Sequence, residues 1–427
     1  MIRTIEVLNY RALRYVKVDV ANFQVLVGPN ASGKSTLFDV VSFVRDILEA
    51  GLERAFLGDA RLGIAPRCFN PKDLTWCGQG GDIEIVLEIE LPEDVKETVD
   101  YPRARYELAI ATDGELGFKT ETLWLRQHGG NGRAKADRQR SLFFPEAEPL
   151  PANGTIVRQP HQKKPINWRK IISKISKTGN DYFKAEKGDW NNQFRLGPSR
   201  SALSNLPEDE QKFRASIWVK QFLMQAVFRL VLNAEAIRLP SAAGVPTAFS
   251  HDGSNLPWVV HDLQERDPKR FVQWVEHVQT ALPDLETIST EQRPDDLARY
   301  VKVRYRNGFT APAWLLSDGT LRLLALTLLA YARPPASVLL IEEPENGIHP
   351  PAMDTVLQAL QSYYDGQIFC ATHSPVVLGL VEIRDLLCFT RAPDGSIAVV
   401  GGDDHPRLKQ WRDNLDLPTL FASGILG

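Results

Sequence analysis

A glycine-containing loop near the amino terminus constrains the fold of this chain more than any other feature. Residues 28–35 read GPNASGKS and match the pattern GxxxxGK[ST]. The loop follows an apolar run, FQVLV, and precedes a helical pattern, TLFDVVSFVRDILEA. A strand, a glycine loop and a helix in this order form the context in which such a loop binds phosphate groups. We therefore expect a strand over FQVLV and a helix directly after the loop.

The residue types of this loop explain how it would bind a nucleotide. Glycine lets the backbone turn so that consecutive N–H groups point inward at phosphate oxygens, and the amino end of the helix adds partial positive charge. Lys34 would reach the β- and γ-phosphates of ATP, and the Ser35 hydroxyl would bind Mg²⁺. A glycine-rich loop that binds no nucleotide is the alternative. The expected nucleotide-binding residues of the loop and helix are Asn30, Gly33, Lys34, Ser35 and Thr36.

Two adjacent carboxylates end a second apolar run, SVLLIEE at residues 337–343. Burying an unpaired carboxylate is unfavourable, so a positive or reactive group should lie at the end of this strand. If this strand lies in one sheet with FQVLV, both strands end at the same edge, where ligands bind in open α/β sheets. Glu342 would then face Mg²⁺, and Glu343 would polarise a water beside the γ-phosphate. A pair of surface acids at a strand end is the alternative.

Two further positions follow the same logic. His373 closely follows the apolar run QIFCA, where an imidazole could donate a hydrogen bond to a γ-phosphate oxygen and so sense hydrolysis. A lone histidine is otherwise more often a structural residue. Ser317 precedes a long apolar helix in LLSDGTLRLLALTLLA, with Gly319 in its first turn, and on capping grounds alone this is an ordinary helix start.

Strands and helices alternate at both ends of the chain, with a different pattern between them. The ends predict an α/β fold with one sheet assembled from amino-terminal and carboxy-terminal segments, and VKVRYR and SVLLIEE are expected in the carboxy-terminal block. Period-two alternation in DIEIVLEIEL, RYELAIAT and ETLWLRQ predicts an antiparallel sheet separate from the first unit. The expected parts are a head formed by residues 1–60 and 296–427, an inserted antiparallel region at 61–200 with a variable polar and basic loop, and a helical insertion at 201–295.

Composition excludes few functions. The chain has 427 residues and a net charge of −3, so a contact with nucleic acid or an anionic membrane would need a local patch. The four cysteines form no CxxC pair, and with no signal-peptide pattern we expect a cytoplasmic protein. The longest apolar stretches are too short to span a bilayer, so no membrane association is expected.

In combination, GPNASGKST, LSDGT, LLIEE and THS resemble the Walker A, signature, Walker B and H-loop elements of ABC-type ATPases. The resemblance is closer to the branch with SMC, RecF and OLD proteins, and within it to stand-alone bacterial AAA family ATPases of the ABC-like group, for which EEPENGIHP and DGSNLP are typical. The motifs cover roughly the first 50 and the last 130 residues. The resemblance implies a P-loop NTPase head of ABC-like fold.

The same resemblance implies roles for individual residues. Two heads would sandwich two ATP molecules, with Ser317 and Gly319 of one subunit touching the γ-phosphate bound by the other. Glu343 would be the catalytic base and His373 the switch residue. Arg11, in NYRAL, matches a position that often contacts nucleotide, although an exposed arginine at a strand end is an equally ordinary reading.

Two residues depart from the usual pattern of ABC-type ATPases. Glu342 replaces the Walker B aspartate, so its distance to Mg²⁺ must adjust by one methylene. Asp318 replaces a signature glycine and brings an acid near a phosphate site. Both departures occur within the resembling group and are subtype marks.

The first functional hypothesis is an ATP hydrolase whose nucleotide-gated homodimer, or higher even oligomer, controls a partner or a DNA-related process such as repair or anti-phage defence. A nucleotide-binding scaffold with little turnover is the alternative. The ATPase subunit of a membrane transporter is a weaker one, because the signature lies much further after the phosphate loop than in such subunits. Any nuclease activity should come from a separate effector protein.

A basic stretch in the middle of the chain is the candidate DNA contact. Residues 157–177, VRQPHQKKPINWRKIISKISK, interleave Lys and Arg with Trp168. Such a composition could bind the phosphate backbone and stack on a base. A solvated basic helix is the commoner structure for it.

Overall fold

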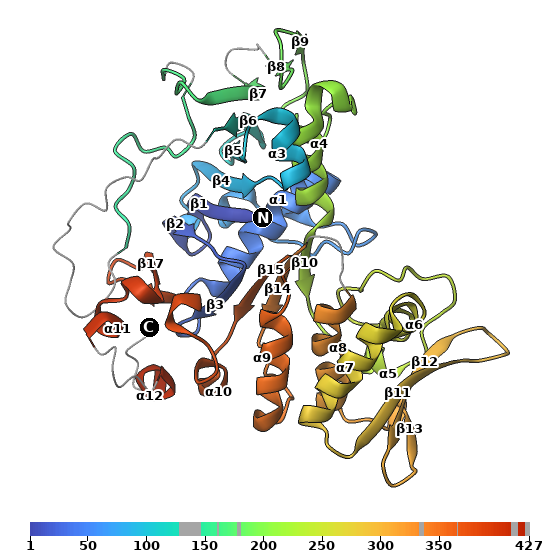
Figure 1. Ribbon diagram of the computed structural model, residues 1–427. Helices are drawn as coiled ribbons and strands as arrows, with labels where there is room; N and C mark the ends of the chain where they lie inside the picture. The colour runs from blue at the N-terminus through green and yellow to red at the C-terminus, as the bar shows by residue number, and fades with distance from the viewer. Residues whose placement is uncertain are drawn as a thin grey trace.

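The computed structural model describes residues 1–127, 147–159, 162–176, 181–332, 337–364, 366–410 and 417–422. Figure 1 shows an upper lobe with a large antiparallel sheet, a central region around α1, and a lower part with helices α5 to α9. The described chain forms three sheets, of eight, six and three strands.

The six-stranded sheet brings the two ends of the chain together, as the sequence predicted. Its order is β10 (Val227–Leu230), β14 (Val338–Glu342), β15 (Gln367–Ala371), β3 (Phe23–Val27), β16 (Leu386–Arg391) and β17 (Ile397–Gly401). All neighbours are parallel except β16 and β17. β3 lies beside β15, which lies beside β14, so their carboxyl ends meet at one edge. One strand, β10, comes from the region expected to be a helical insertion.

Both faces of this sheet are covered, which explains its near-continuous apolar strands. Leu26 packs in one hydrophobic core with α1 (Lys34–Ala50) and the large antiparallel sheet. Its neighbours Val25 and Val27 point the other way, into a second core. That core contains α6 (Leu256–Arg266), α7 (Pro268–Ala281), α8 (Asp318–Ala332) and α9 (Met353–Gln361). The phosphate-loop helix is therefore held between two sheets.

The large antiparallel sheet differs from the prediction. Its order is β2 (Leu13–Asp19), β1 (Ile2–Tyr10), β4 (Asp82–Glu90), β5 (Arg103–Ala111), β6 (Gly117–Arg126), β7 (Trp168–Ile175), β8 (Asp181–Lys184) and β9 (Asn191–Phe194). The expectation of a sheet separate from the amino-terminal unit is wrong, because β1 pairs with β4. Alternation identifies which face of a strand is buried but does not identify its partner strand.

The remaining elements connect these sheets. α2 (Leu52–Leu57) follows α1, α3 (Glu93–Val99) follows β4, and α4 (Glu210–Gln225) leads into β10. The run VKVRYR lies in β12 (Arg299–Tyr305), which pairs with β11 (Leu285–Gln292) and β13 (Thr310–Pro312) in the three-stranded sheet, not in the six-stranded one. α5 (Ala234–Arg238) precedes α6, and the last described helices are α10 (Pro375–Leu378), α11 (Pro406–Gln410) and α12 (Leu417–Ala422). The boundaries at 60, 200 and 295 stay predictions.

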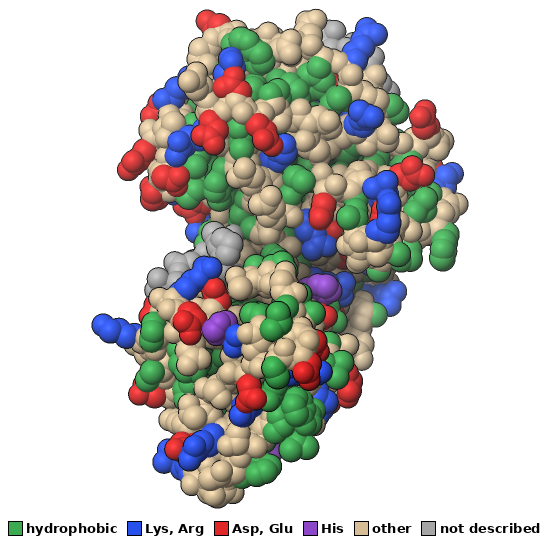
Figure 2. All heavy atoms as spheres, turned by 90° about the vertical axis from the view of Figure 1, so that its right-hand side faces the viewer, with side chains coloured by type: hydrophobic (Ala, Val, Ile, Leu, Met, Phe, Trp, Pro, Cys, Tyr) green, Lys and Arg blue, Asp and Glu red, His purple; other side chains and the backbone are tan. Residues whose placement is uncertain are grey.

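Figure 2 shows a waist between the two lobes on one face of the molecule. Acidic and basic side chains are interspersed over that face, in keeping with the small net charge. Among the residues that the structure describes, no helix is both long and apolar enough to cross a membrane.

Candidate functional site

The phosphate loop has the geometry that its sequence predicts. β3 ends at Val27 and α1 begins at Lys34. Gly28 has a φ of 149°, and a Cβ there would lie 2.4 Å from the carbonyl oxygen of Phe389, so only glycine fits. Gly33 has a φ of 93° and provides no side-chain cap for α1. The amino end of the helix thus lacks the usual side-chain acceptor, which is the arrangement that suits an anion.

Lys34 lies inside this loop and close to the acid pair. Its buried amine donates to the carbonyl oxygens of Gly28 at 2.7 Å and Pro29 at 2.9 Å. Burial lowers the pKa of Lys34 to about 8, although the charges of Glu343 and Glu342 oppose that shift. The two ends of the chain meet here, because β14, which carries Glu342, lies in one sheet with β3.

Glu342 ends β14 directly opposite the first turn of α1. The Ser35 hydroxyl donates to its Oε2 atom at 3.2 Å, across 307 positions of sequence. Its other oxygen, Oε1, accepts from Nη2 of Arg229 at 2.7 Å. Motif reasoning missed Arg229, which lies in β10 and in none of the quoted motifs. A hydroxyl and a carboxylate side by side suit Mg²⁺, which binds few protein oxygens and keeps phosphate and water ligands.

Glu343 occupies an uncommon backbone position. Its φ is 47°, in the left-handed region, and its N–H donates to the carbonyl of Ala371 at 2.8 Å. A non-glycine residue in this region is held by its surroundings and is often found at functional sites. The side chain is exposed at the strand edge, so it is free to face a bound ligand.

His373 lies at the same edge, after β15, and is half-buried. Burial and the nearby Lys34 charge lower its pKa, so the imidazole is neutral near pH 7. Its backbone N–H donates to Oε1 of Glu345 at 3.3 Å, and the Thr372 hydroxyl donates to the same oxygen at 2.6 Å. Glu345 is thus a second residue that motif reasoning missed. The sequence feature that could have identified Glu345 is its position two residues after the acid pair.

The signature residues contact the loop that follows the acid pair in the same chain. Ser317 caps α8, since the N–H of Thr320 donates to its hydroxyl at 3.2 Å. A Cβ on Gly319 would lie 2.3 Å from the carbonyl oxygen of Gly347, so the two backbones are in close contact. Asp318 forms an ion pair with Arg238. Within this chain, α8 therefore begins against the segment that carries Glu343.

Arg11 supports the phosphate-loop helix. Its Nη1 atom lies 2.9 Å from Oδ2 of Asp39, one turn into α1. Asp39 also accepts from Arg67 at 2.8 Å and from the Tyr10 hydroxyl at 2.6 Å. This ion pair gives Arg11 a structural contact, and its contact with nucleotide stays a prediction. Asn30 in the loop and Ser35 in the first turn of α1 are exposed, and Thr36 is half-buried.

The basic stretch is not a helix, and that expectation was wrong. Residues 168–175 form β7, in which Lys174 is buried and donates to the carbonyl oxygen of Gly197 at 2.9 Å. The Lys170 amine lies 4.6 Å from the ring centre of Trp124, and burial lowers its pKa. The Trp168 ring is also occupied, because the guanidinium of Arg126 lies 4.7 Å from its centre and that of Arg158 lies 5.0 Å away.

Only part of the basic stretch therefore presents free charge. Lys163 and Lys164 are exposed, whereas Lys177 and residues 160–161 lie outside the described residues. Among the described residues of the stretch, the two adjacent lysines are the exposed charged ones, and their contact with DNA stays a prediction.

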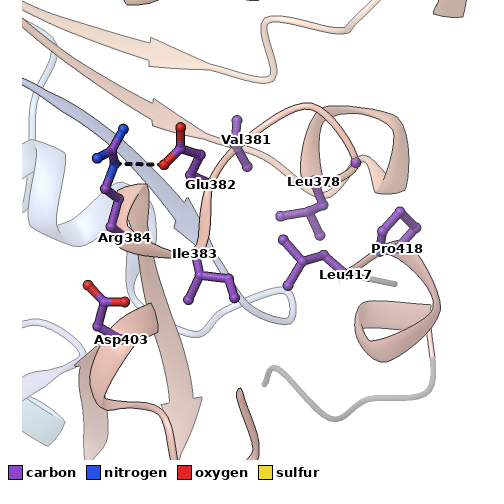
Figure 3. A pocket seen from close by; sticks show the side chains of 9 residues that line it. Leu378, Val381, Glu382, Ile383, Arg384, Asp403, Leu417 and Pro418 are labelled. Carbon is purple, nitrogen blue, oxygen red and sulfur yellow. Dashed lines mark ion pairs between the residues drawn. The ribbon is translucent and has the colours of Figure 1, made fainter. Parts of the chain in front are cut away.

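A separate cavity of about 550 Å³ lies beyond α10 (Figure 3). Leu378, Ile383 and Leu417 point toward one another there, and an ion pair of 2.8 Å joins Arg384 to Glu382 at its rim. α10 begins two residues after His373, so the chain runs directly from the end of β15 into the lining of this cavity. Nothing in its lining identifies an occupant.

The fold and the site together define an ABC-like P-loop ATPase of the SMC-like type. The chain belongs to the family described as "AAA domain, putative AbiEii toxin, Type IV TA system", whose model matches residues 23–379. No curated protein matches the sequence.

Solved structures that resemble the chain are SMC head domains. An SMC head bound to the C-winged helix domain of ScpA has a TM-score of 0.52 at 14% identity, covering 93% of this chain and 96% of that one. An SMC head with an extended coiled coil, bound to the C-terminal domain of ScpA from Pyrococcus furiosus, has a TM-score of 0.48 at 11% identity, covering 93% and 95%. The SMC head from Thermotoga maritima has a TM-score of 0.43 at 12% identity, covering 94% and 98%. The first of these supports the SMC-head fold.

Proposed function

We propose that this protein binds Mg-ATP at the carboxyl ends of β3, β14 and β15 and hydrolyses it. The observation that carries the proposal is the hydrogen bond between Ser35 and Glu342, 3.2 Å long. It joins the first residue after the loop lysine to the first acid of the pair. Bound Mg²⁺ would neutralise phosphate charge there, and Ser35 and Glu342 are the residues that would hold it.

Other residues of the site would bind the phosphates and assist the attack of water. The Lys34 amine and the amino end of α1 bind and orient the phosphates. The exposed Glu343 carboxylate accepts a proton from the attacking water, and its fixed backbone, bonded to Ala371, sets its direction. His373 is neutral and can donate a hydrogen bond from its one ring N–H to a γ-phosphate oxygen. Catalysis of this kind depends mainly on positioning and electrostatics.

The proposal extends to a dimer in which two heads share two ATP molecules. Ser317 and Asp318 are exposed at the start of α8, where a second copy could bring its phosphate loop. The cycle would control a separate partner, such as a nuclease, in a DNA-related process or in anti-phage defence. The family's description and the ScpA-bound SMC head are the comparisons that support a partner. We expect the protein to act in the cytoplasm.

The experiment compares wild type with Glu343→Gln, measuring phosphate release and the molar mass with and without ATP and DNA. We expect Glu343→Gln to lose about 100-fold in turnover or more and to form a dimer that requires ATP. Lys34→Ala should neither bind nucleotide nor dimerise. The matched control is Glu286→Gln, an exposed acid on β11 far from the loop in sequence, which should behave as wild type.

Each result decides one part of the proposal. Equal turnover in wild type and Glu343→Gln would refute the catalytic assignment. Nucleotide binding with no turnover in wild type would favour a scaffold. A molar mass that ATP does not change would refute the shared-site dimer and leave the nucleotide site standing.

A further inference from the structure

Arg229 is placed by strand geometry beside the acid that faces the phosphate-loop serine. β10 and β14 are parallel neighbours, with Arg229 opposite Leu340 in register. Successive side chains of a strand point to opposite faces, so Glu342 shares a face with Leu340. Val227 and Leu340 both pack in the core that contains α1, which identifies that face. The end of β10 therefore brings a guanidinium to the same side as the phosphate loop.

The two oxygens of Glu342 have different partners. Arg229 donates to Oε1 at 2.7 Å, and Ser35 donates to Oε2 at 3.2 Å. A glutamate has one more rotatable bond than the aspartate usual at this position, so its carboxylate is less constrained by the backbone alone. A contact on one oxygen fixes the orientation of the other, because the carboxylate is planar. Oε2 is thereby directed toward Ser35.

The strand that carries Arg229 is anchored to the elements on either side. Nη1 of Arg45, on α1, donates to the carbonyl oxygen of Val227 at 3.2 Å. The N–H of Val338 donates to the carbonyl oxygen of Ala226 at 2.7 Å, which fixes the start of β10 against β14. The guanidinium borders a cavity of about 200 Å³, and its Nε is buried without a hydrogen-bond partner in the described structure. The position of the arginine thus depends on both α1 and β14.

We propose that Arg229 is a positioning residue that orients Glu342 so that this glutamate can bind Mg²⁺ at the end of β14. It acts through Glu342 by holding Oε1, so that Oε2 and the Ser35 hydroxyl form one Mg²⁺ site. Partners of metal ligands typically raise metal affinity by about 10–100-fold. This inference rests on the proposed function, since it concerns the same Mg²⁺ site.

The test measures the affinity of a fluorescent ATP analogue over a range of Mg²⁺ concentrations and with excess EDTA. Arg229→Gln, which keeps much of the side-chain volume, should raise the half-saturating Mg²⁺ concentration about tenfold. Affinity in EDTA should change much less, because the effect passes through the metal ligand. Arg229→Lys should restore part of the effect, since lysine keeps the charge without the planar fork. Arg304→Gln is the control, because Arg304 forms an exposed ion pair with Glu286 at 3.1 Å.

The same variants in a Glu342→Asp background separate positioning from a general charge effect. Aspartate is too short to keep the contact with residue 229, so Arg229→Gln should then change the Mg²⁺ requirement by no more than about twofold. Equal effects in both backgrounds, or an equal loss of affinity in EDTA, would overturn the inference. No difference between wild type and Arg229→Gln would also overturn it. Nucleotide binding by wild type that ignores Mg²⁺ would overturn the proposed function as well, which distinguishes the two failures.

Discussion

Replacing Gly319 by alanine tests whether the signature helix and the acid pair form one unit within a single chain. The new Cβ would lie 2.3 Å from the carbonyl oxygen of Gly347, in the turn that follows Glu343. Ordinary contact requires the two backbones to separate by about 1 Å, and overpacking of this kind costs about 1–3 kcal/mol. Alanine also gains about 1 kcal/mol over glycine in a helix. The expected net loss is therefore about 1 kcal/mol, and at most about 2 kcal/mol.

Two assays follow from this magnitude. Thermal unfolding should show a fall of about 2–4 °C, since about 1 kcal/mol shifts the melting temperature of a large domain by this amount. Turnover should fall further than stability, by about 10–100-fold, because a shift of about 1 Å in a reacting group can have that effect. Nucleotide affinity should change less, since the phosphate loop lies on another element.

Gly401→Ala is the matched control. Gly401 has a φ of −64°, and a Cβ there would meet nothing within 4 Å. This variant should keep the stability and turnover of wild type. If Gly319→Ala matched it in both assays, the contact between α8 and the Gly347 turn would be irrelevant to the site and the reasoning refuted.

Three further predictions concern other parts of the site. Nucleotide affinity should weaken as pH rises through about 8, because burial lowers the pKa of Lys34 to about 8 and only the protonated amine attracts phosphate. Affinity that stays flat from about pH 7 to about pH 9.5 in a fluorescence titration would contradict this. Glu345→Ala should lower the free energy of unfolding by about 1–2 kcal/mol in urea, because it removes the acceptor at the end of β15, whereas the exposed Glu286→Ala should be neutral; equal values would count against it. Charge reversal of Lys163 and Lys164 should weaken DNA binding and flatten its salt dependence, and unchanged affinity would dismiss the contact.

The predictable part of the site is the part that depends on local context. GPNASGKS indicates a strand before the loop and a helix after it, and SVLLIEE and QIFCA are short apolar runs that favour buried strands. Because parallel strands end at a common edge, Lys34, Glu342 and His373 could be placed together before their distances were known. The fold class follows from the same reasoning.

The remaining features depend on which distant segments pair, and the chain carries no local sign of that. Arg229 stands in FRL, a short run at the end of a helix, and becomes important only because β10 pairs with β14. The basic composition of WRKIISKI hid a strand in which residues 171–174, Lys174 among them, are all buried. The Lys174 amine tolerates burial because backbone carbonyls surround it, which composition alone does not reveal.

The exchange of strands between the ends and the middle of the chain makes these parts mutually dependent. β1 and β2 complete the sheet of the supposed insertion, and β10, which lies within that region, belongs to the ATPase sheet. Excising the middle would therefore strip a strand from the nucleotide-binding sheet and leave an unpaired edge at β1. Insertions and deletions that keep every strand of both sheets fall in the loops between strands.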